Sequence, residues 1–285
     1  MRSDRGFFRT AALSLALLAS FGVTPASAQR GGPDADAEPP APVRRMADGT
    51  PDISGLYQAN AGGANYGLES KPGQFLVPGS RGVVVDPPDG LLPYRDWARA
   101  EQIDRTLPQR GYDDPTAHCF VAAGPPRVHY VPSPFQIIQT SGYVVMLFER
   151  MSWRIIPLDG REHIPDAIRL WNGDSVGRWE GDTLVVDTRN MNGKTWLNEY
   201  GDVTSHAQSI VERYTPTSAD SIHYQATVSD PIVFTSPWTI EMDFNRNDDE
   251  ILEVACHEDN QDLEHLRDVR DEWRAQQAEE GATQQ

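Results

Sequence analysis

The sequence lacks any apolar run that is long enough to cross a membrane as a helix. Its most apolar stretch, residues 11–23, has 13 residues, whereas a spanning helix needs about 20. Three arginines precede this stretch, and Ala26-Ser27-Ala28 follows it, which is the pattern of a secretion signal and its cleavage site. The sequence therefore predicts a signal peptide over residues 1–28 and a periplasmic or secreted location. An uncleaved membrane anchor is the alternative interpretation.

Basic residues are also scarce, with 25 Lys and Arg against 42 Asp and Glu, so the net charge is −17. Residues 1–28 contain three Arg and one Asp, and the chain without them has a net charge of −19. Such a charge repels nucleic acids and anionic membranes. We therefore expect a small-molecule ligand or substrate as the partner, and no nucleic acid. The charge permits a cationic or neutral substrate, and a solvated acidic surface is the alternative explanation for it. The sequence does not determine the oligomeric state.

The chain lacks the motifs of metal and nucleotide sites. No His-x-x-x-His pair occurs, and His118, His129 and His257 are scattered along the chain. No glycine-rich loop opens a helix as a phosphate-binding loop would. We therefore expect neither a metal ion nor another cofactor.

Only two cysteines are present, Cys119 and Cys256. In an oxidising compartment such a pair favours one disulfide that closes a long loop and contributes about 3–5 kcal/mol of stability. The alternative is that Cys119 is a nucleophile activated by His118 or another base. Sequence adjacency gives this alternative little support, because the two groups must meet in space.

From Pro134 onward, short β-rich runs alternate with turns. The expected strands are residues 135–139, 143–148, 153–158, 171–180, 183–187, 209–214, 221–229, 238–244 and 251–256. In 221–229 apolar and polar residues alternate, which predicts one buried and one solvated face. Short connections without crossover helices disfavour a parallel sheet. The pattern predicts an all-β fold, an up-and-down antiparallel barrel, as a single domain over residues 51–277.

The region before the barrel has a different composition. Residues 29–50 are rich in Pro, Gly, Ala and Asp, which predicts a flexible leader. Residues 81–85 favour a short strand. Residues 94–107 favour a surface helix that ends before Pro108.

The C-terminal region predicts a helix over residues 262–276. Its apolar stripe, which we expect to pack on the barrel, consists of Leu263, Leu266, Val269 and Trp273. The polar residues 278–285 are expected to form a frayed tail.

Segment 171–188, WNGDSVGRWEGDTLVVDT, predicts a hairpin that turns at Glu180-Gly181-Asp182. Gly173-x-Ser175-x-Gly177 within it copies the pattern of a nucleophile elbow. That motif requires a strand, a sharp turn and a helix, and a strand follows here, so we reject the match. Arg178 and Glu180 share one face of their strand, and the sequence leaves open whether this face lines the barrel or meets water.

Several segments together resemble a large family of exported, mostly uncharacterised bacterial proteins with a PDLSGVW-like start and a central GxSxGRWEGDTLVVDT motif. The matching segments are PDISGLY at 51–57, CFVAAGPPR at 119–127, PFQIIQT at 134–140, GDSVGRWEGDTLVVDT at 173–188, Thr195-Trp196, SHAQSIVER at 205–213, Asp230-Pro231 and Cys256. The resemblance implies a calycin-like or lipocalin-like barrel and no particular activity. Two departures are Gln208, where the family has an acidic residue after the histidine, and one extra residue between Cys119 and Gly124.

Three residues are catalytic candidates. His206 lies in a polar segment just before a strand, and imidazole exchanges protons near neutral pH. Its alternative role is to bind the loop backbone. Glu212 would face the barrel interior together with Ile210, and a buried carboxylate needs a partner. Glu149, at the end of a strand, is the third candidate.

Four residues are candidates for substrate binding. Arg154 and Arg178 lie on expected strands and could pair with an inward carboxylate. Arg127 follows two prolines and could hold a carboxylate or a hydroxylated ligand. Trp196 belongs to the Thr195-Trp196 match. The alternative for the charged residues is a structural ion network, because paired buried charges need not be functional.

These residues favour an exported β-barrel enzyme that acts on a small, partly apolar organic molecule by cofactor-free acid–base chemistry, as a lyase, isomerase or hydrolase. His206 would transfer the proton, Glu212 or Glu149 would orient it, and an arginine would stabilise negative charge. The alternative is a non-catalytic periplasmic, lipocalin-like binding protein for a lipid or aromatic ligand. A third hypothesis is an envelope interaction protein that uses its acidic surface.

Overall fold

The computed structural model describes residues 39–73, 78–120, 124–150 and 152–283. The expected signal peptide over residues 1–28 lies outside the described residues. Within the described ranges, none of the helices combines the length and the apolar character that a bilayer-spanning helix requires.

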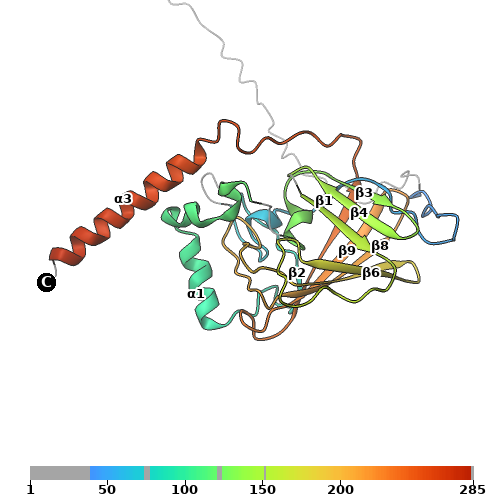
Figure 1. The fold of residues 1–285 in the computed structure, drawn as a ribbon, viewed down its shortest axis with the longest axis horizontal. Coiled ribbons are helices and arrows are strands. Elements are labelled where there is room, and N and C mark those ends of the chain that lie inside the picture. The colour runs from blue at the N-terminus through green and yellow to red at the C-terminus, as the bar shows by residue number, and fades with distance from the viewer. Residues whose placement is uncertain (1–38, 74–77, 121–123, 151, 284–285) are drawn as a thin grey trace, which may run out of the picture. The chain divides into compact units, whose positions relative to one another are not determined.

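Nine antiparallel strands in the described chain form a nearly closed barrel (Figure 1). Their bounds are β1 Gly55–Asn60, β3 Phe135–Gln139, β4 Tyr143–Phe148, β5 Ser152–Pro157, β6 Asp174–Glu180, β7 Thr183–Arg189, β8 Ser209–Pro216, β9 Ser221–Ser229 and β10 Trp238–Arg246. Around the barrel each of these strands lies beside the next one in the chain, and β10 pairs with β1. This confirms the predicted all-β, up-and-down antiparallel barrel. The short β2, Val84–Asp86, pairs with the first half of β10, beyond the end of β1.

The barrel has a seam between β5 and β6, which adjoin each other although no ladder joins them in the described chain. Side chains bridge this seam: Nη2 of Arg154 on β5 donates to Oγ of Ser175 on β6 over 3.0 Å. A Cβ at Gly177 would lie 2.8 Å from Ile156, so glycine permits the close approach of the two strands.

The barrel interior is filled by side chains that alternate along the strands. On β9 the buried residues are Ile222, Tyr224, Ala226 and Val228, as the sequence pattern predicts. The interior aromatic residues are Tyr57, Phe135, Phe148, Tyr214, Tyr224 and Phe244. The short helix α2, Arg127–Tyr130, places the His129 ring among them, with ring centroids 4.9–5.7 Å apart.

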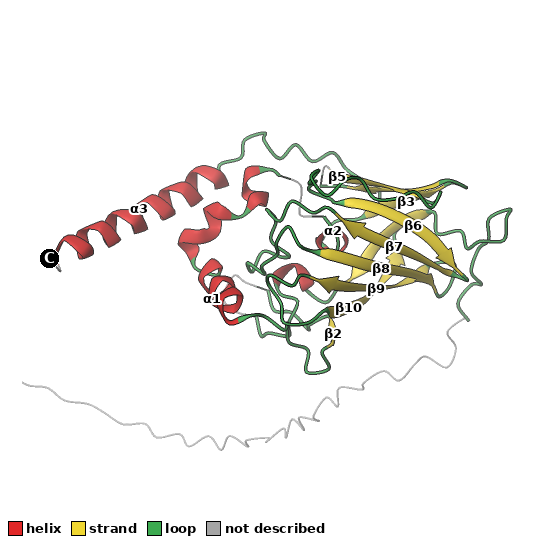
Figure 2. Cartoon of the chain, turned by 60° about the horizontal axis from the view of Figure 1, so that its bottom comes forward, coloured by secondary structure: helices red, strands yellow, loops and turns green. Residues whose placement is uncertain are grey.

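Short helices and the long C-terminal helix cluster beside the barrel (Figure 2). Their bounds are η1 Ala64–Tyr66, α1 Asp96–Arg105, η2 Pro108–Asp113, η3 Pro115–His118 and α3 Asp262–Thr283. The predicted surface helix is confirmed by α1. The disulfide between Cys119 and Cys256 is also present, with Cα atoms 5.7 Å apart, and it joins the end of η3 to the segment before α3. The alternative role of Cys119 as a free nucleophile is therefore wrong.

The expectation that the C-terminal helix packs on the barrel is wrong. Its packing partners are η2 and η3, and Leu266 fills the space next to Gly111, where a Cβ would lie 2.8 Å from the leucine. Val269 and Trp273 stay about 40% exposed, at 41% and 40%. The helix also continues to Thr283, past the expected end at Gln276, because alanine and glutamate in its last turns favour helix.

Two further expectations differ from the structure. Residues 251–256 form no strand. Leu252 is 58% exposed, so its side chain is not packed against the barrel core. Cys256 is held next to η3 by the disulfide instead. Residues 39–50 of the expected flexible leader contact the barrel. Arg45 makes a two-pronged ion pair with Asp182, with N–O distances of 2.5 and 2.6 Å, because the hairpin turn presents that carboxylate outward.

The open question about the hairpin is resolved. Arg178 is exposed and its guanidinium pairs with Glu180 over 2.5 Å on the outer surface. Trp179, on the opposite face, packs against the core. The charged face of this strand therefore meets water.

Candidate functional site

A network of polar side chains lies inside the barrel around Glu212 on β8. Arg154 donates to both carboxylate oxygens over 3.0 and 2.5 Å, and Tyr214 and Tyr224 donate to Oε1 over 2.8 and 2.9 Å. Nε2 of His129 lies 3.2 Å from the same oxygen. The Glu212 and His129 side chains are fully buried. The structure thus brings together two predicted site residues, Glu212 and Arg154. The sequence predicted this pair, because an inward carboxylate needs a partner and Arg154 was one of the candidates.

A second nitrogen of the Arg154 guanidinium joins the network to neighbouring strands, whereas its Nε has no hydrogen-bond partner among the described residues. Its Nη2 donates to Thr188 on β7 over 3.1 Å and to Ser175 on β6, and both hydroxyls are buried. A surface cavity of about 320 Å³ at the seam reaches Arg154 and Ser175, but only 3% and 5% of these residues are exposed. The guanidinium is therefore committed to the interior and is not available to a ligand.

Charges inside the network hold one another in place. Burial alone would raise the pKa of Glu212, but the positive charge of Arg154 and hydrogen bonds from His129 and Arg154 hold this pKa well below its ordinary range. Burial alone would lower the pKa of Arg154, and the Glu212 charge raises it instead. Burial lowers the pKa of His129, which keeps its imidazole neutral at neutral pH. The network is thus a buried ion pair between Glu212 and Arg154, surrounded by tyrosine hydroxyls and a neutral histidine.

His129 is the network residue that the sequence analysis missed. It lies in Val128-His129-Tyr130-Val131, and a histidine within an apolar run was the signal that could have indicated burial. Nδ1 of His129 has no hydrogen-bond partner among the described residues. We infer that the network tightens the barrel, because it joins β5, β6, β7, β8, β9 and α2 through one carboxylate and one guanidinium.

The structure does not bring the other catalytic candidates to Glu212. His206 is exposed in a turn before β8, and its backbone carbonyl accepts from Arg169. Glu149 is half-buried in the turn after β4. The expectation that Glu212 orients His206 is wrong, because both carboxylate oxygens of Glu212 are occupied inside the barrel. The prediction that Arg178 pairs with an inward carboxylate is also wrong, since Arg178 lies on the outer surface.

Arg127 and Trp196 belong to a second place, at the end of the barrel beside the helices. Arg127 is buried, and its Nη1 donates to the backbone carbonyl of Trp196 over 3.0 Å. The same nitrogen lies 4.0 Å from Oδ1 of Asp114. Arg127 therefore positions two residues of a cavity wall and does not itself face the cavity.

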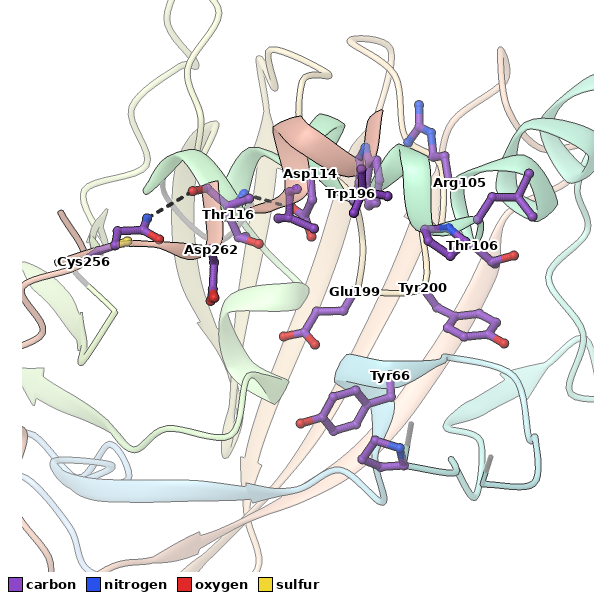
Figure 3. Close-up of a pocket in the computed structure, with 18 of the residues that line it drawn as sticks. Tyr66, Arg105, Thr106, Asp114, Thr116, Trp196, Glu199, Tyr200, Cys256 and Asp262 are labelled. Carbon is purple, nitrogen blue, oxygen red and sulfur yellow. Dashed lines mark hydrogen bonds between the residues drawn. The ribbon is translucent and has the colours of Figure 1, made fainter. Parts of the chain in front are cut away.

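This end cavity has a volume of about 750 Å³ (Figure 3). Its polar and aromatic lining includes Tyr66, Arg105, Asp114, Thr116, Arg150, Trp196, Glu199, Tyr200 and Asp262, and its apolar floor includes Leu107, Leu266 and Val269. Figure 3 shows that Tyr66, Glu199 and Asp262 come from three separate parts of the chain and open onto the same space. The disulfide contributes Cys256 to the wall, so it ties α3 to the cavity.

The cavity combines ring faces with carboxylates. The Arg105 guanidinium lies 5.0 Å from the centroid of the Trp196 ring and is paired with Glu101 over 2.8 Å. Oε1 of Glu199 accepts a hydrogen bond from the side-chain amide of Asn65 over 2.8 Å. Such walls suit a molecule with an aromatic ring and hydrogen-bond donors.

No protein-family model, no curated protein and no solved structure matches the chain. The resemblance to a family of exported proteins therefore stays a prediction. In the described ranges, no group of three or more His, Cys, Asp or Glu residues has the geometry of a metal site.

Proposed function

We propose that this protein binds a small aromatic molecule with a positively charged group in the end cavity. The observation that carries the proposal is a preformed space of about 750 Å³, within the range of small-molecule sites. Its lining combines the rings of Tyr66, Trp196 and Tyr200, the carboxylates of Asp114, Glu199 and Asp262 and the guanidinium groups of Arg105 and Arg150. Arg105 already lies over the Trp196 ring and Lys71 over the Tyr200 ring, so the cation of the ligand is assigned to the ring of Tyr66. Aromatic faces attract cations, and the net charge of −17 raises the local concentration of a cationic ligand.

A ligand inside the barrel, as in a lipocalin-like carrier, is not supported. The interior positions are occupied by aromatic side chains and by His129. The acid–base mechanism through His206 and Glu212 is not proposed further, because these residues do not meet. The binding hypothesis of the sequence analysis is kept, with the site moved from the interior to the end of the barrel. A periplasmic or secreted location is part of the proposal, and the disulfide supports it, since disulfides persist in oxidising compartments.

Titration calorimetry with three matched compounds tests the proposal: phenethylamine, the neutral phenethyl alcohol and the anionic hydrocinnamate. We expect the cation to bind tightest. Tyr66→Ala should weaken its binding about 2- to 30-fold, which corresponds to the roughly 0.5–2 kcal/mol of a cation–π contact. Trp153→Ala is the matched control, because Trp153 is an exposed aromatic residue on β5 outside this cavity. Failure of all three compounds to bind, tightest binding of the anion, or equal effects of the two variants would overturn the proposal.

A further inference from the structure

A second, smaller cavity lies on the other side of Tyr200. Its volume is about 200 Å³, and Tyr200 lines both cavities. The residues that line it are Gly67, Leu68, Glu69, Ser70, Lys71, Pro72, Gln102, Tyr200 and Asp202. It therefore combines an amine, two carboxylates and a ring in a confined space that the binding proposal does not use.

Lys71 is held firmly at this cavity. Its backbone N–H donates to the Ser80 carbonyl over 2.9 Å, and its own carbonyl accepts from the Ser80 N–H over 3.0 Å. The Nζ atom lies 2.8 Å from the centroid of the Tyr200 ring. This nitrogen is buried and has no hydrogen-bond partner among the described residues. The face of the Tyr200 ring is therefore the contact that favours its ammonium form, which no hydrogen-bond acceptor among the described residues stabilises further.

The carboxylates around Lys71 are occupied by other partners. Glu69 receives two hydrogen bonds from Arg99, over 2.5 and 3.1 Å. Asp202 accepts from the Tyr94 hydroxyl over 2.9 Å and from Asn198 over 2.6 Å. Neither carboxylate lies within ion-pair distance of Nζ, although the charge of Asp202 acts on it.

Two pKa shifts follow from this arrangement. Burial lowers the pKa of Lys71 to about 8, and the negative charge of Asp202 opposes that shift only in part. Burial raises the pKa of Asp202 to about 6; hydrogen bonds from Tyr94 and Asn198 oppose this rise, and the charge of Glu69 adds to it. A fraction of Lys71 is thus an uncharged amine near neutral pH, and a fraction of Asp202 is a neutral carboxyl group.

We propose that Lys71 is a nucleophile that forms an imine with a small aldehyde or ketone bound in this second cavity. The lone pair of Nζ attacks the carbonyl carbon, and the carbonyl oxygen takes up a proton to give a carbinolamine. The nitrogen then loses a proton to solvent, and the hydroxyl group takes up a proton and leaves as water, which gives a protonated C=N bond. Carbonyl and amine condense with release of one water, and no oxidant or reductant is needed.

The chain itself supplies a control for this proposal. Its sequence contains two lysines, Lys71 and Lys194. Lys194 is exposed, so its amine meets bulk water. Any difference in reactivity between the two amines therefore reports the environment of Lys71. The proposal does not depend on the end cavity, so Tyr66→Ala should leave the reaction of Lys71 unchanged.

The experiment is reductive trapping with propanal and cyanoborohydride, followed by peptide mass mapping of the intact folded protein. At pH 7 we expect Lys71 to be modified at least about tenfold faster than Lys194, since an ordinary lysine with a pKa of about 10.4 is almost wholly protonated. The rate at Lys71 should rise with pH through about 8. Lys71→Arg should remove this fast modification, and Lys194→Arg should not. Equal or faster modification of Lys194, or a rate at Lys71 that does not rise through that pH, would overturn the proposal.

Discussion

Replacement of Glu212 by glutamine should destabilise the barrel strongly. The substitution keeps the size of the side chain and leaves the Arg154 guanidinium as a buried charge without its counter-charge. Arg154 loses its ion pair of 2.5 Å and keeps only uncharged partners, among them the hydroxyls of Ser175 and Thr188. Removing one partner of a buried pair costs about 3–5 kcal/mol, because the remaining charge stays desolvated.

The double variant Arg154→Met with Glu212→Gln separates charge from packing. It removes both charges, and the tyrosine hydroxyls can still bind the glutamine amide. Its loss of stability should be smaller than the sum of the two single losses by about 0.5–3 kcal/mol, the range found for directly coupled residues. For a domain of this size, the Glu212→Gln loss corresponds to a decrease in Tm of about 6–20 °C.

The assay is urea denaturation at pH 7 for the wild type, both single variants and the double variant. Glu149→Gln is the matched control, since it makes the same change at a half-buried carboxylate in a turn, and it should cost less than about 0.5 kcal/mol. Additive losses in the double variant, or a Glu212→Gln loss no larger than that of the control, would show that the ion pair does not hold the barrel together. The depressed pKa of Glu212 adds a pH signature: its contribution to stability is present above the ordinary pKa of glutamate and is lost as pH falls below it.

Three other changes have predictable results. The double variant Cys119→Ser with Cys256→Ser opens a loop of 137 residues. The unfolded chain then gains entropy, which should lower the free energy of unfolding by up to about 5 kcal/mol. Denaturation under non-reducing conditions measures this loss, and an unchanged midpoint would contradict it. The folded pKa of Asp202, about 6, lies above its ordinary value of 3.8, so the stability that its proton contributes is present below about pH 4 and is lost as pH rises through 6. The difference between wild type and Asp202→Asn should show this loss, and parallel stability–pH curves would refute it. Arg178→Ala should change the free energy of unfolding by less than about 0.5 kcal/mol, because the Arg178–Glu180 pair is exposed, and a larger loss in thermal denaturation would contradict that assignment.

The strand positions were predictable because they depend on local patterns. Period-two alternation in 221–229 and turn residues at Gly142 and Gly181 mark where strands begin and end, and the observed β3, β4 and β9 have the predicted bounds. The disulfide was also predictable, since two cysteines allow one pairing. Residues 251–256 misled the prediction because an apolar-polar alternation without a neighbouring strand cannot form a sheet.

The candidate site was predictable only in part. The inward position of Glu212 follows from the alternation of β8, and its need for an arginine follows from the cost of burying a charge. The choice of Arg154 over Arg178 depends on which face of each strand lines the barrel, and the partnership with His129 depends on the insertion of α2. Both are contacts between residues far apart in sequence, which spacing along the chain does not encode.

The sequence by itself determined the antiparallel barrel, the disulfide and the acidic character of the surface, because each follows from local periodicity, from a count of cysteines or from a count of charges. Only the tertiary structure decided that the charged face of the 171–188 hairpin meets water, that the barrel interior is filled, and that the two cavities lined by Tyr200 lie outside the barrel interior. These features depend on tertiary packing, since the cavities form only where helices, loops and a disulfide from separate parts of the chain meet. For the same reason Lys71, which no sequence motif marks, is placed as a buried amine behind Tyr200.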